Sequence, residues 1–252
     1  MDGLLDRALI LHLVAYRDAD LMVSMLAEGR GRLDASAPAG RKSRTRYQAG
    51  LDKYCVLELE LATDRRGRHR IRSSRLVDPL EGLRSDVERL AAAELVCEVA
   101  RATAPEGPEG GVLFAPVLAL LRLLAAVDRG RVGPVTWGGL LWVLATQGFV
   151  PRDCRCARCD ASPAPGQDLL FSLSSSSLRC EAHALDPGAM HRLSPGARAL
   201  ADAATSGSLR PLAQGEAADG DLRLMARYAE IRVHEVLPRV PRSLEFFRQV
   251  VG

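Results

Sequence analysis

Three cysteines and one histidine form two short pairs late in the chain, Cys156-Ala-Arg-Cys159 and Cys180-Glu-Ala-His183. Two residues separate the members of each pair, so a tight turn can point both side chains at one ion. Thiolate sulfur and imidazole nitrogen are ligands that Zn2+ prefers, and four of them fill a tetrahedral site. The spacing therefore predicts a structural Cys3His zinc site, without the open position that a catalytic zinc needs for water.

The same cysteines allow two other interpretations, burial in a core and disulfide bonding. Four of the six cysteines lie within the 27 residues that end at Cys180, which favours a metal site. Cys154 is an extra thiol and could take the place of Cys156 or His183 as a ligand. His191 is a weaker candidate, because a lone histidine after a methionine is more often a surface or capping residue.

Two segments near the start of the chain carry dense positive charge. Residues 41–46 hold four cations, and residues 65–75 hold six arginines, with no acid in either segment. Alternate residues of a strand share a face, so the arginines from Arg66 to Arg72 would form a cationic stripe suited to phosphate. With two arginines of a Gly-containing turn, the candidate DNA ligands are Arg30, Arg32, Arg41, Lys42, Arg44, Arg46, Arg66, Arg68, Arg70 and Arg72.

These charges have a simpler alternative, which is that they only keep the surface soluble. Two acid-free segments in one small region make nucleic-acid binding an equal competitor. Tyr16, Tyr47 and Tyr54 could then supply faces on which bases stack. Trp137 and Trp142 lie in a helical pattern, where packing is a better explanation than base stacking.

The first eighty residues have the pattern of strands. Alternating apolar residues and Gly-bearing turns recur over short distances, which is typical of a small β-barrel. The sequence predicts strands at residues 7–14, 21–27, 33–37, 54–61 and 69–77.

Beyond Pro79 the apolar spacing is that of helices. Thr136 is a plausible cap for the start of the third helix, and Gly148 is a plausible stop after it. Between the third and fourth helices, the apolar residues 169–173 could form a short hairpin over the metal site. The predicted helices cover residues 83–102, 113–128, 136–147, 194–205, 219–236 and 242–250.

The composition is that of a soluble globular protein. A chain of 252 residues with 47% hydrophobic residues can bury a core and form two domains, while the net charge is only +3. No signal peptide is visible, and Arg122 breaks the apolar run from Val112 to Val127, which is shorter than the ~20 residues that span a bilayer. We expect a cytoplasmic protein without membrane contact, in which Cys55 and Cys97 are unreactive core residues.

Several short motifs, in this order and spacing, resemble the recombination mediator family RecO over most of the chain. Individually the motifs are weak, and their combination is fairly specific. They are Tyr16-Arg-Asp-Ala-Asp-Leu-Met-Val, Glu28-Gly-Arg-Gly-Arg-Leu, Ala39-Gly-Arg-Lys-Ser-Arg, Leu51-Asp-Lys-Tyr, Ser74-Arg-Leu-Val-Asp-Pro, Gly148-Phe-Val-Pro before the first cysteine pair, and Arg242-Ser-Leu-Glu-Phe-Phe.

The resemblance implies an α+β fold. An N-terminal OB-fold at residues 1–80 would be followed by a helical domain at 81–252, with a zinc-binding insertion at about 150–190. It also implies a non-enzymatic role in DNA repair: binding single- and double-stranded DNA, annealing complementary strands, and helping to load RecA with RecR and single-stranded DNA-binding protein. The protein would be cytoplasmic and associated with the nucleoid during repair. His183 stands where many relatives have cysteine.

Two other classes of protein remain as alternatives. A zinc-dependent nucleic-acid hydrolase would need a motif such as H-E-x-x-H, and none occurs. A DNA-binding transcription regulator would need a basic recognition helix, whereas the predicted helices are apolar or mixed in charge.

Overall fold

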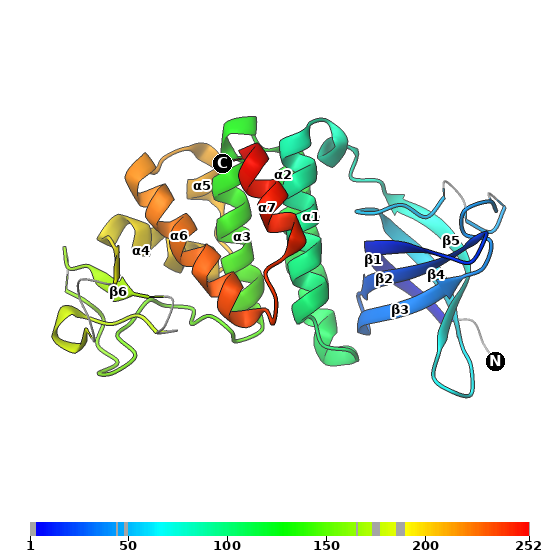
Figure 1. Cartoon of the computed structure of the whole chain (residues 1–252), viewed down its shortest axis with the longest axis horizontal. Helices are drawn as coiled ribbons and strands as arrows, with labels where there is room; N and C mark the ends of the chain where they lie inside the picture. The colour runs from blue at the N-terminus through cyan, green and yellow to red at the C-terminus, as the bar shows by residue number, and fades with distance from the viewer. Residues whose placement is uncertain are drawn as a thin grey trace. The chain divides into compact units, whose positions relative to one another are not determined.

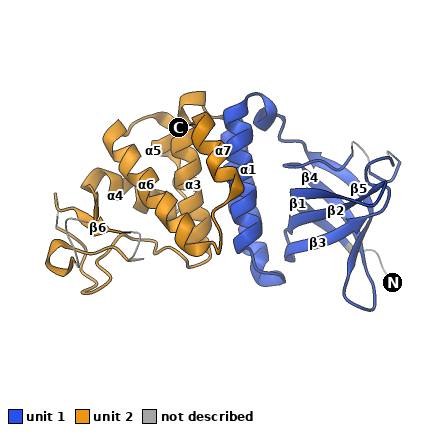
Figure 2. Cartoon of the chain, in the orientation of Figure 1, with its two compact units in different colours: residues 1–126 blue, residues 127–252 orange. Residues whose placement is uncertain are grey.

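The structure is a computed structural model that describes residues 4–43, 45–47, 50–164, 166–172, 177–184 and 190–251 (Figure 1). The chain divides into two compact units, Met1–Ala126 and Val127–Gly252, which Figure 2 colours separately. The first unit holds a β-barrel and two helices, and the second holds further helices and a small sheet.

Five strands close into a barrel in the order β1-β2-β3-β5-β4. All neighbouring pairs are antiparallel except β3 and β5, which are parallel. This order is that of an OB-fold, the predicted class. The strands are β1 (Leu4–Tyr16), β2 (Asp20–Ala27), β3 (Gly31–Ala37), β4 (Val56–Thr63) and β5 (His69–Asp78).

The barrel closes because alternate residues of its strands are apolar. In β3 every second residue from Gly31 to Ala37 is buried, and the residues between them are less buried or exposed. The inward side chains form one core that includes Met25, Leu57 and Ile71, each at most 1% exposed. The five predicted strands are therefore confirmed, with ends shifted by a few residues.

Helix α1 (Val87–Thr103) begins later than predicted. A short 3-10 helix, η1 (Glu81–Arg84), precedes it, and Asp86 then caps α1 by accepting a hydrogen bond from the Arg89 backbone N–H at 2.9 Å. Partial burial alone would raise the pKa of the Asp86 carboxyl, but hydrogen bonds from Arg89 and Ser85 lower it below its ordinary value. Asp86 is thus the residue that fixes where the long helix starts.

The apolar run of the first unit forms η2 (Pro108–Leu113) and α2 (Phe114–Ala126). By length and composition alone, Pro108–Ala126 could cross a membrane, a test that core helices of soluble proteins also pass. One face of α2 is buried, including Leu120 and Leu124, and the helix contacts α1 and β1. These contacts agree with the predicted buried helix.

The second unit is mainly helical, and two features of its helices differ from prediction. Thr136 does not cap a helix: it is buried within α3, and its hydroxyl donates to the Val132 carbonyl at 2.7 Å. Pro134 lies in the first turn, where proline is tolerated, so the helix starts before it. Helix α5 was not predicted. The helices are α3 (Val132–Thr146), α4 (Pro195–Thr205), α5 (Arg210–Gln214), α6 (Asp219–Val236) and α7 (Arg242–Val251), with 3-10 helices η3 (Arg129–Arg131) and η4 (Glu181–His183).

Both tryptophans pack within the second unit. Trp137 is 9% exposed and meets the Phe247 ring edge-on, with 5.6 Å between ring centroids. Trp142 is half-buried, and its indole lies against Gly207, where an added Cβ would come within 3.0 Å. The packing role predicted for both side chains is confirmed.

The apolar segment near the metal pattern is a strand, but not the predicted hairpin. Strand β6 (Leu169–Phe171) pairs antiparallel with β7 (His191–Leu193), twenty residues further on. Leu170 also exchanges backbone hydrogen bonds of 2.7 and 2.8 Å with Arg179. Leu173, which we expected in the hairpin, lies outside the described residues.

Replacing Asp86 by alanine should lower the free energy of unfolding by about 1 kcal/mol, because the Arg89 N–H loses its acceptor. Asp86→Asn keeps an acceptor and is the matched control, with a smaller loss at neutral pH. Since the folded-state pKa is lowered, the carboxylate stabilises the protein above the ordinary aspartate pKa, and this contribution disappears as pH falls through the lowered value. Denaturant unfolding at neutral pH and at about pH 3 measures both effects; equal losses for alanine and asparagine would contradict the capping role.

Candidate metal centre and basic surface

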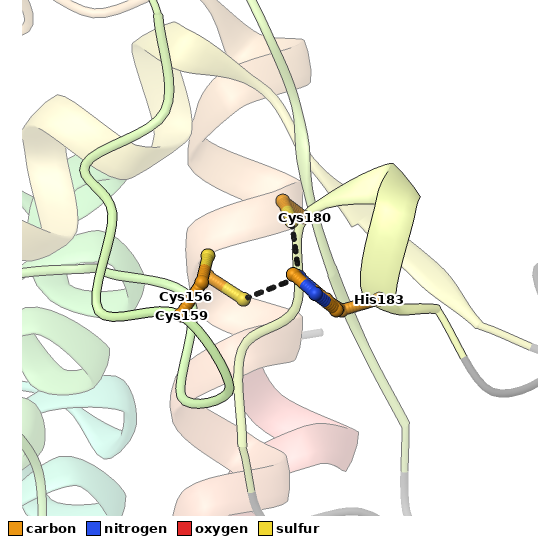
Figure 3. A group of neighbouring side chains, drawn as sticks. All are labelled: Cys156, Cys159, Cys180 and His183. Atoms are coloured by element: carbon orange, nitrogen blue, oxygen red, sulfur yellow. Dashed lines mark hydrogen bonds between the residues drawn. The ribbon is translucent and has the colours of Figure 1, made fainter.

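The four predicted zinc ligands meet in the second unit. One ligand atom from each of Cys156, Cys159, Cys180 and His183 lies within 4.8 Å of every other (Figure 3). The His183 Nδ1 atom is 3.1 Å from the Cys180 sulfur and 3.7 Å from the Cys156 sulfur. The spacing in sequence thus becomes a cluster in space.

These distances fit one zinc ion. With Zn–S and Zn–N bonds of about 2.3 and 2.0 Å, tetrahedral geometry places a sulfur and a nitrogen ligand about 3.6 Å apart. The two measured sulfur–nitrogen distances lie close to that value, so the side chains need little movement to bind. The donor set suits Zn2+, and four protein ligands would leave no position for a reacting water.

Backbone hydrogen bonds hold the two cysteine turns in place. The Ala157 N–H donates to the Leu178 carbonyl at 2.9 Å, which joins the first turn to the residues before Cys180. Within the first turn, the Asp160 N–H donates to the Cys156 carbonyl at 2.8 Å, and Asp160 adopts a left-handed φ of 55°. The backbone therefore positions the two cysteine turns next to each other.

The electrostatics of the cluster favour one thiolate. Burial alone would raise the pKa of the Cys156 thiol, but N–H groups of Cys180, Cys159 and Arg158 bond to its sulfur and lower the pKa to about 6. Cys156 is fully buried, Cys159 is exposed, and Cys180 and His183 are half-buried. A buried sulfur already prone to deprotonation is a suitable first ligand for a cation.

Cys154 lies apart from the cluster among the described residues. Its thiol is buried and faces Asp202 of α4, and burial followed by the charge of Asp202 raises the pKa of the thiol. The Cys154 N–H donates to the Asp202 carboxylate at 2.7 Å. These contacts tie the first cysteine turn to α4, which gives Cys154 a structural explanation. The two cysteines of the first unit, Cys55 and Cys97, are buried as predicted, and burial raises the pKa of each thiol.

The basic segment after β3 is tied to the barrel on two sides. The Arg41 N–H donates to the Ala19 carbonyl in the β1–β2 turn at 3.1 Å. At its other end, the Ser74 N–H of β5 donates to the Arg46 carbonyl at 3.0 Å. We call residues 38–47 the basic loop; Arg44 within it lies outside the described residues. This loop spans from the β1–β2 turn to β5.

Tyr47 anchors the loop. Its side chain is fully buried, and its hydroxyl lies 3.0 Å from the Pro38 carbonyl and 3.4 Å from the Ile71 carbonyl, within donating distance of both. Burial raises the pKa of Tyr47, while the nearby charges of Arg46 and Arg70 act to lower it. The basic loop that carries Arg46 is therefore held against β5, which carries Arg70, and both guanidinium charges act on the pKa of one buried phenol.

The predicted stripe is only partly formed. Strand β5 begins at His69, so Arg66 and Arg68 lie on the β4–β5 turn. Of the four arginines of the predicted stripe, Arg70 and Arg72 are the two exposed on the strand. The Asp64 carboxylate accepts from the backbone N–H groups of Arg66 and Arg68 and forms the turn. The strand predicted at 69–77 already excluded Arg66 and Arg68, so the predicted stripe was longer than the strand that could carry it.

Several candidate cations pair with acids. Arg30 lies 3.7 Å from Asp6, and Arg32 pairs with Glu106 at 2.7 Å, on the β2–β3 side next to η2. Arg68 pairs with Asp64, and Arg72 pairs with Glu60 at 3.6 Å. Among the candidates that the structure describes, those with exposed side chains and no salt bridge are Arg41, Lys42, Arg46, Arg66 and Arg70.

Two of the three tyrosines proposed for base stacking are buried, which corrects that prediction. Tyr47 is 0% exposed, and Tyr54 is 5% exposed with its hydroxyl bonded to Glu94 of α1. Tyr16 is 45% exposed. Arg17, which is not among the predicted DNA ligands, places its guanidinium 5.1 Å from the centre of the Tyr16 ring. An arginine next to an exposed aromatic residue was the available signal.

An OB-fold barrel with a basic loop, followed by helices and a Cys/His cluster, defines a class of nucleic-acid-associated proteins. The comparisons with known proteins identify the family. The profile described as "Recombination protein O N terminal" matches residues 1–80, and "Recombination protein O C terminal" matches residues 84–233. The chain belongs to the recombination protein O (RecO) family of DNA repair proteins.

Curated relatives agree with this assignment. A DNA repair protein RecO of Myxococcus xanthus is 28% identical over 176 residues, covering 70% of each chain. One from a Nocardioides species is 29% identical over 176 residues, covering 69% of this chain and 72% of the relative. One from an Anaeromyxobacter species is 27% identical over 210 residues, covering 82% of this chain and 78% of the relative.

Removing a cluster cysteine should release the metal. We expect wild-type protein to carry about one zinc ion per chain, and Cys156→Ser and Cys159→Ser each to carry less than about half and to melt at lower temperature. Cys154→Ala is the matched control, because its thiol faces Asp202, and it should keep its zinc. Metal analysis with thermal unfolding tests this; zinc loss in the Cys154 variant alone would show that the ligand set is wrong.

Proposed function

We propose that this protein is a non-enzymatic mediator of DNA repair and recombination, which binds single- and double-stranded DNA through its barrel. Residues 1–80 would form the DNA-binding domain, and residues 81–252 the helical domain with a zinc insertion at about 150–190. The observation that supports this most strongly is that Tyr47 holds the basic loop against β5, because this contact brings two basic segments of the chain next to each other. Family membership supports the same role.

The surface suits phosphate groups. Arginine and lysine side chains without a protein carboxylate can neutralise phosphates and release counterions, which drives binding to DNA of any sequence. The β4–β5 turn and the β1–β2 turn, which border common OB-fold ligand sites, carry Arg66 and Arg17 respectively. We therefore rank the cations without salt bridges above Arg30, Arg32, Arg68 and Arg72, which are already paired.

Annealing follows from the same chemistry. Two complementary strands repel each other through their phosphates, and bound cations reduce that repulsion while the bases stay free to pair. In this proposal the protein lowers the barrier between strands and breaks no covalent bond. It would act with RecR and single-stranded DNA-binding protein to help load RecA, in the cytoplasm and at the nucleoid.

The zinc site would support folding and not catalysis. A Cys3His set fills the coordination of the ion, which argues against the alternative of a zinc-dependent hydrolase. The other alternative, a transcription regulator, gains no support from the described helices, since the unpaired candidate cations lie on loops and strands of the barrel. Added Mg2+ or Zn2+ with a labelled oligonucleotide should give no cleavage products.

The triple variant Arg41→Ala, Lys42→Ala, Arg46→Ala should weaken binding to unrelated sequences alike. Each lost phosphate contact should flatten the plot of log affinity against log salt concentration by about one unit. Arg75→Ala is the matched control, because Arg75 is an exposed barrel arginine already held by Glu58 at 2.8 and 3.0 Å. Fluorescence anisotropy over a salt series measures both quantities.

An unchanged affinity and slope in the triple variant would show that the surface is misassigned. A loss in the Arg75 variant of about one third of that in the triple variant, in proportion to the charge removed, would show that only total charge matters. A strand-annealing assay, with and without single-stranded DNA-binding protein, completes the test: wild type should speed annealing and the triple variant should not.

A further inference from the structure

An outward-facing apolar strip lies on the first two barrel strands. Leu13 of β1 packs against the barrel core, so its neighbour Val14 points outward, and Tyr16 shares that face two residues on. Val14 is 49% exposed and Tyr16 is 45% exposed. Large apolar side chains that lie exposed next to each other on a strand can mark a binding site.

The neighbouring strand extends the strip. Val23 of β2 is in the core, so Met22 beside it points outward. Met22 pairs directly with Val14 across the ladder, and paired side chains lie about 5 Å apart. We call Val14, Tyr16 and Met22 the apolar strip. It lies on the outer face of β1 and β2.

Cations border the strip at the Tyr16 end. Arg17 holds a left-handed φ of 56°, and its guanidinium lies over the Tyr16 ring. The same turn accepts the backbone hydrogen bond from Arg41, so the basic loop begins next to it. Asp18, which is exposed in this turn, offsets part of the charge, so the aromatic ring is the distinctive feature of this turn.

A flat apolar surface beside phosphate-binding cations fits an unpaired base. Charge alone attracts single strands and duplexes, but only unpaired bases can lie on an aromatic face, and guanidinium planes stack on bases as well. Tyr16 is suited to this because it is exposed, whereas the Tyr47 and Tyr54 rings of the described barrel region are buried.

We propose that Tyr16, with Arg17 over its ring and Val14 and Met22 beside it, is a base-stacking platform that gives the barrel its preference for single-stranded over duplex DNA. This inference rests on the proposed DNA binding by the barrel. It assigns discrimination between strand types to the strip and general affinity to the basic loop.

The test uses the full chain and three probes of equal length: oligo(dT), a duplex, and a strand in which abasic sites replace the bases. Tyr16→Ala should bind oligo(dT) roughly 5-fold or more weakly and the duplex within about 2-fold of wild type, since one stacked base is lost. Tyr16→Phe keeps a ring and should match wild type on both probes. Wild type should discriminate against the abasic strand, and Tyr16→Ala should lose most of that discrimination. Circular dichroism confirms that each variant is folded.

The outcomes separate the two proposals. In one outcome the triple basic-loop variant loses binding, while Tyr16→Ala either weakens binding to oligo(dT) and duplex equally or weakens neither. The stacking platform is then wrong, and DNA binding by the barrel stands. If Tyr16→Phe loses as much as Tyr16→Ala, the hydroxyl and not stacking matters, and the platform is again wrong. If wild type binds no probe at low salt, both proposals are wrong.

Discussion

The proposed DNA-binding surface depends on one buried side chain, the phenol of Tyr47. It holds the basic loop against the barrel through its packing and through its hydroxyl, which lies within hydrogen-bonding distance of the Pro38 and Ile71 carbonyls. Burying a tyrosine hydroxyl is favourable only when it finds acceptors, so the loop is fixed where both carbonyls are available. Through this anchor, the basic loop that carries Arg46 is held beside β5, which carries Arg70.

The sequence predicted the strands and helices well, and the turns and contacts at their ends poorly. Strand positions followed from alternating apolar residues, and α6 matched its predicted range of 219–236, because periodicity reflects burial directly. The stripe from Arg66 to Arg72 was wrong at its start, since Arg66 and Arg68 lie before the predicted strand 69–77 and before β5, in a turn that Asp64 closes. Tyr54 was predicted to begin a strand, but β4 starts at Val56, and Tyr54 is buried against α1, a contact between residues forty positions apart.

The Cys/His cluster shows the same difference between what local spacing predicts and what tertiary contacts decide. Its four members could be named from local spacing, because each pair sits in one turn and the cluster brings only two turns together. The role of Cys154 could not be predicted. It lies two residues before Cys156, a position from which it could either bind the metal or pack in the core. Asp202, forty-eight residues later on α4, gives it a packing role. Spacing thus identifies the members of a site, whereas burial and ionic partners come from tertiary contacts.

The most direct test of the central claim is amide hydrogen exchange with and without a saturating oligonucleotide at low salt. We expect added protection over the basic loop, residues 38–47, and over β5 and the turn before it, since DNA would cover the surface that Tyr47 assembles. We expect no comparable change in the first cysteine turn, residues 154–160. Protection confined to residues 127–251, with the barrel unchanged, would contradict the claim.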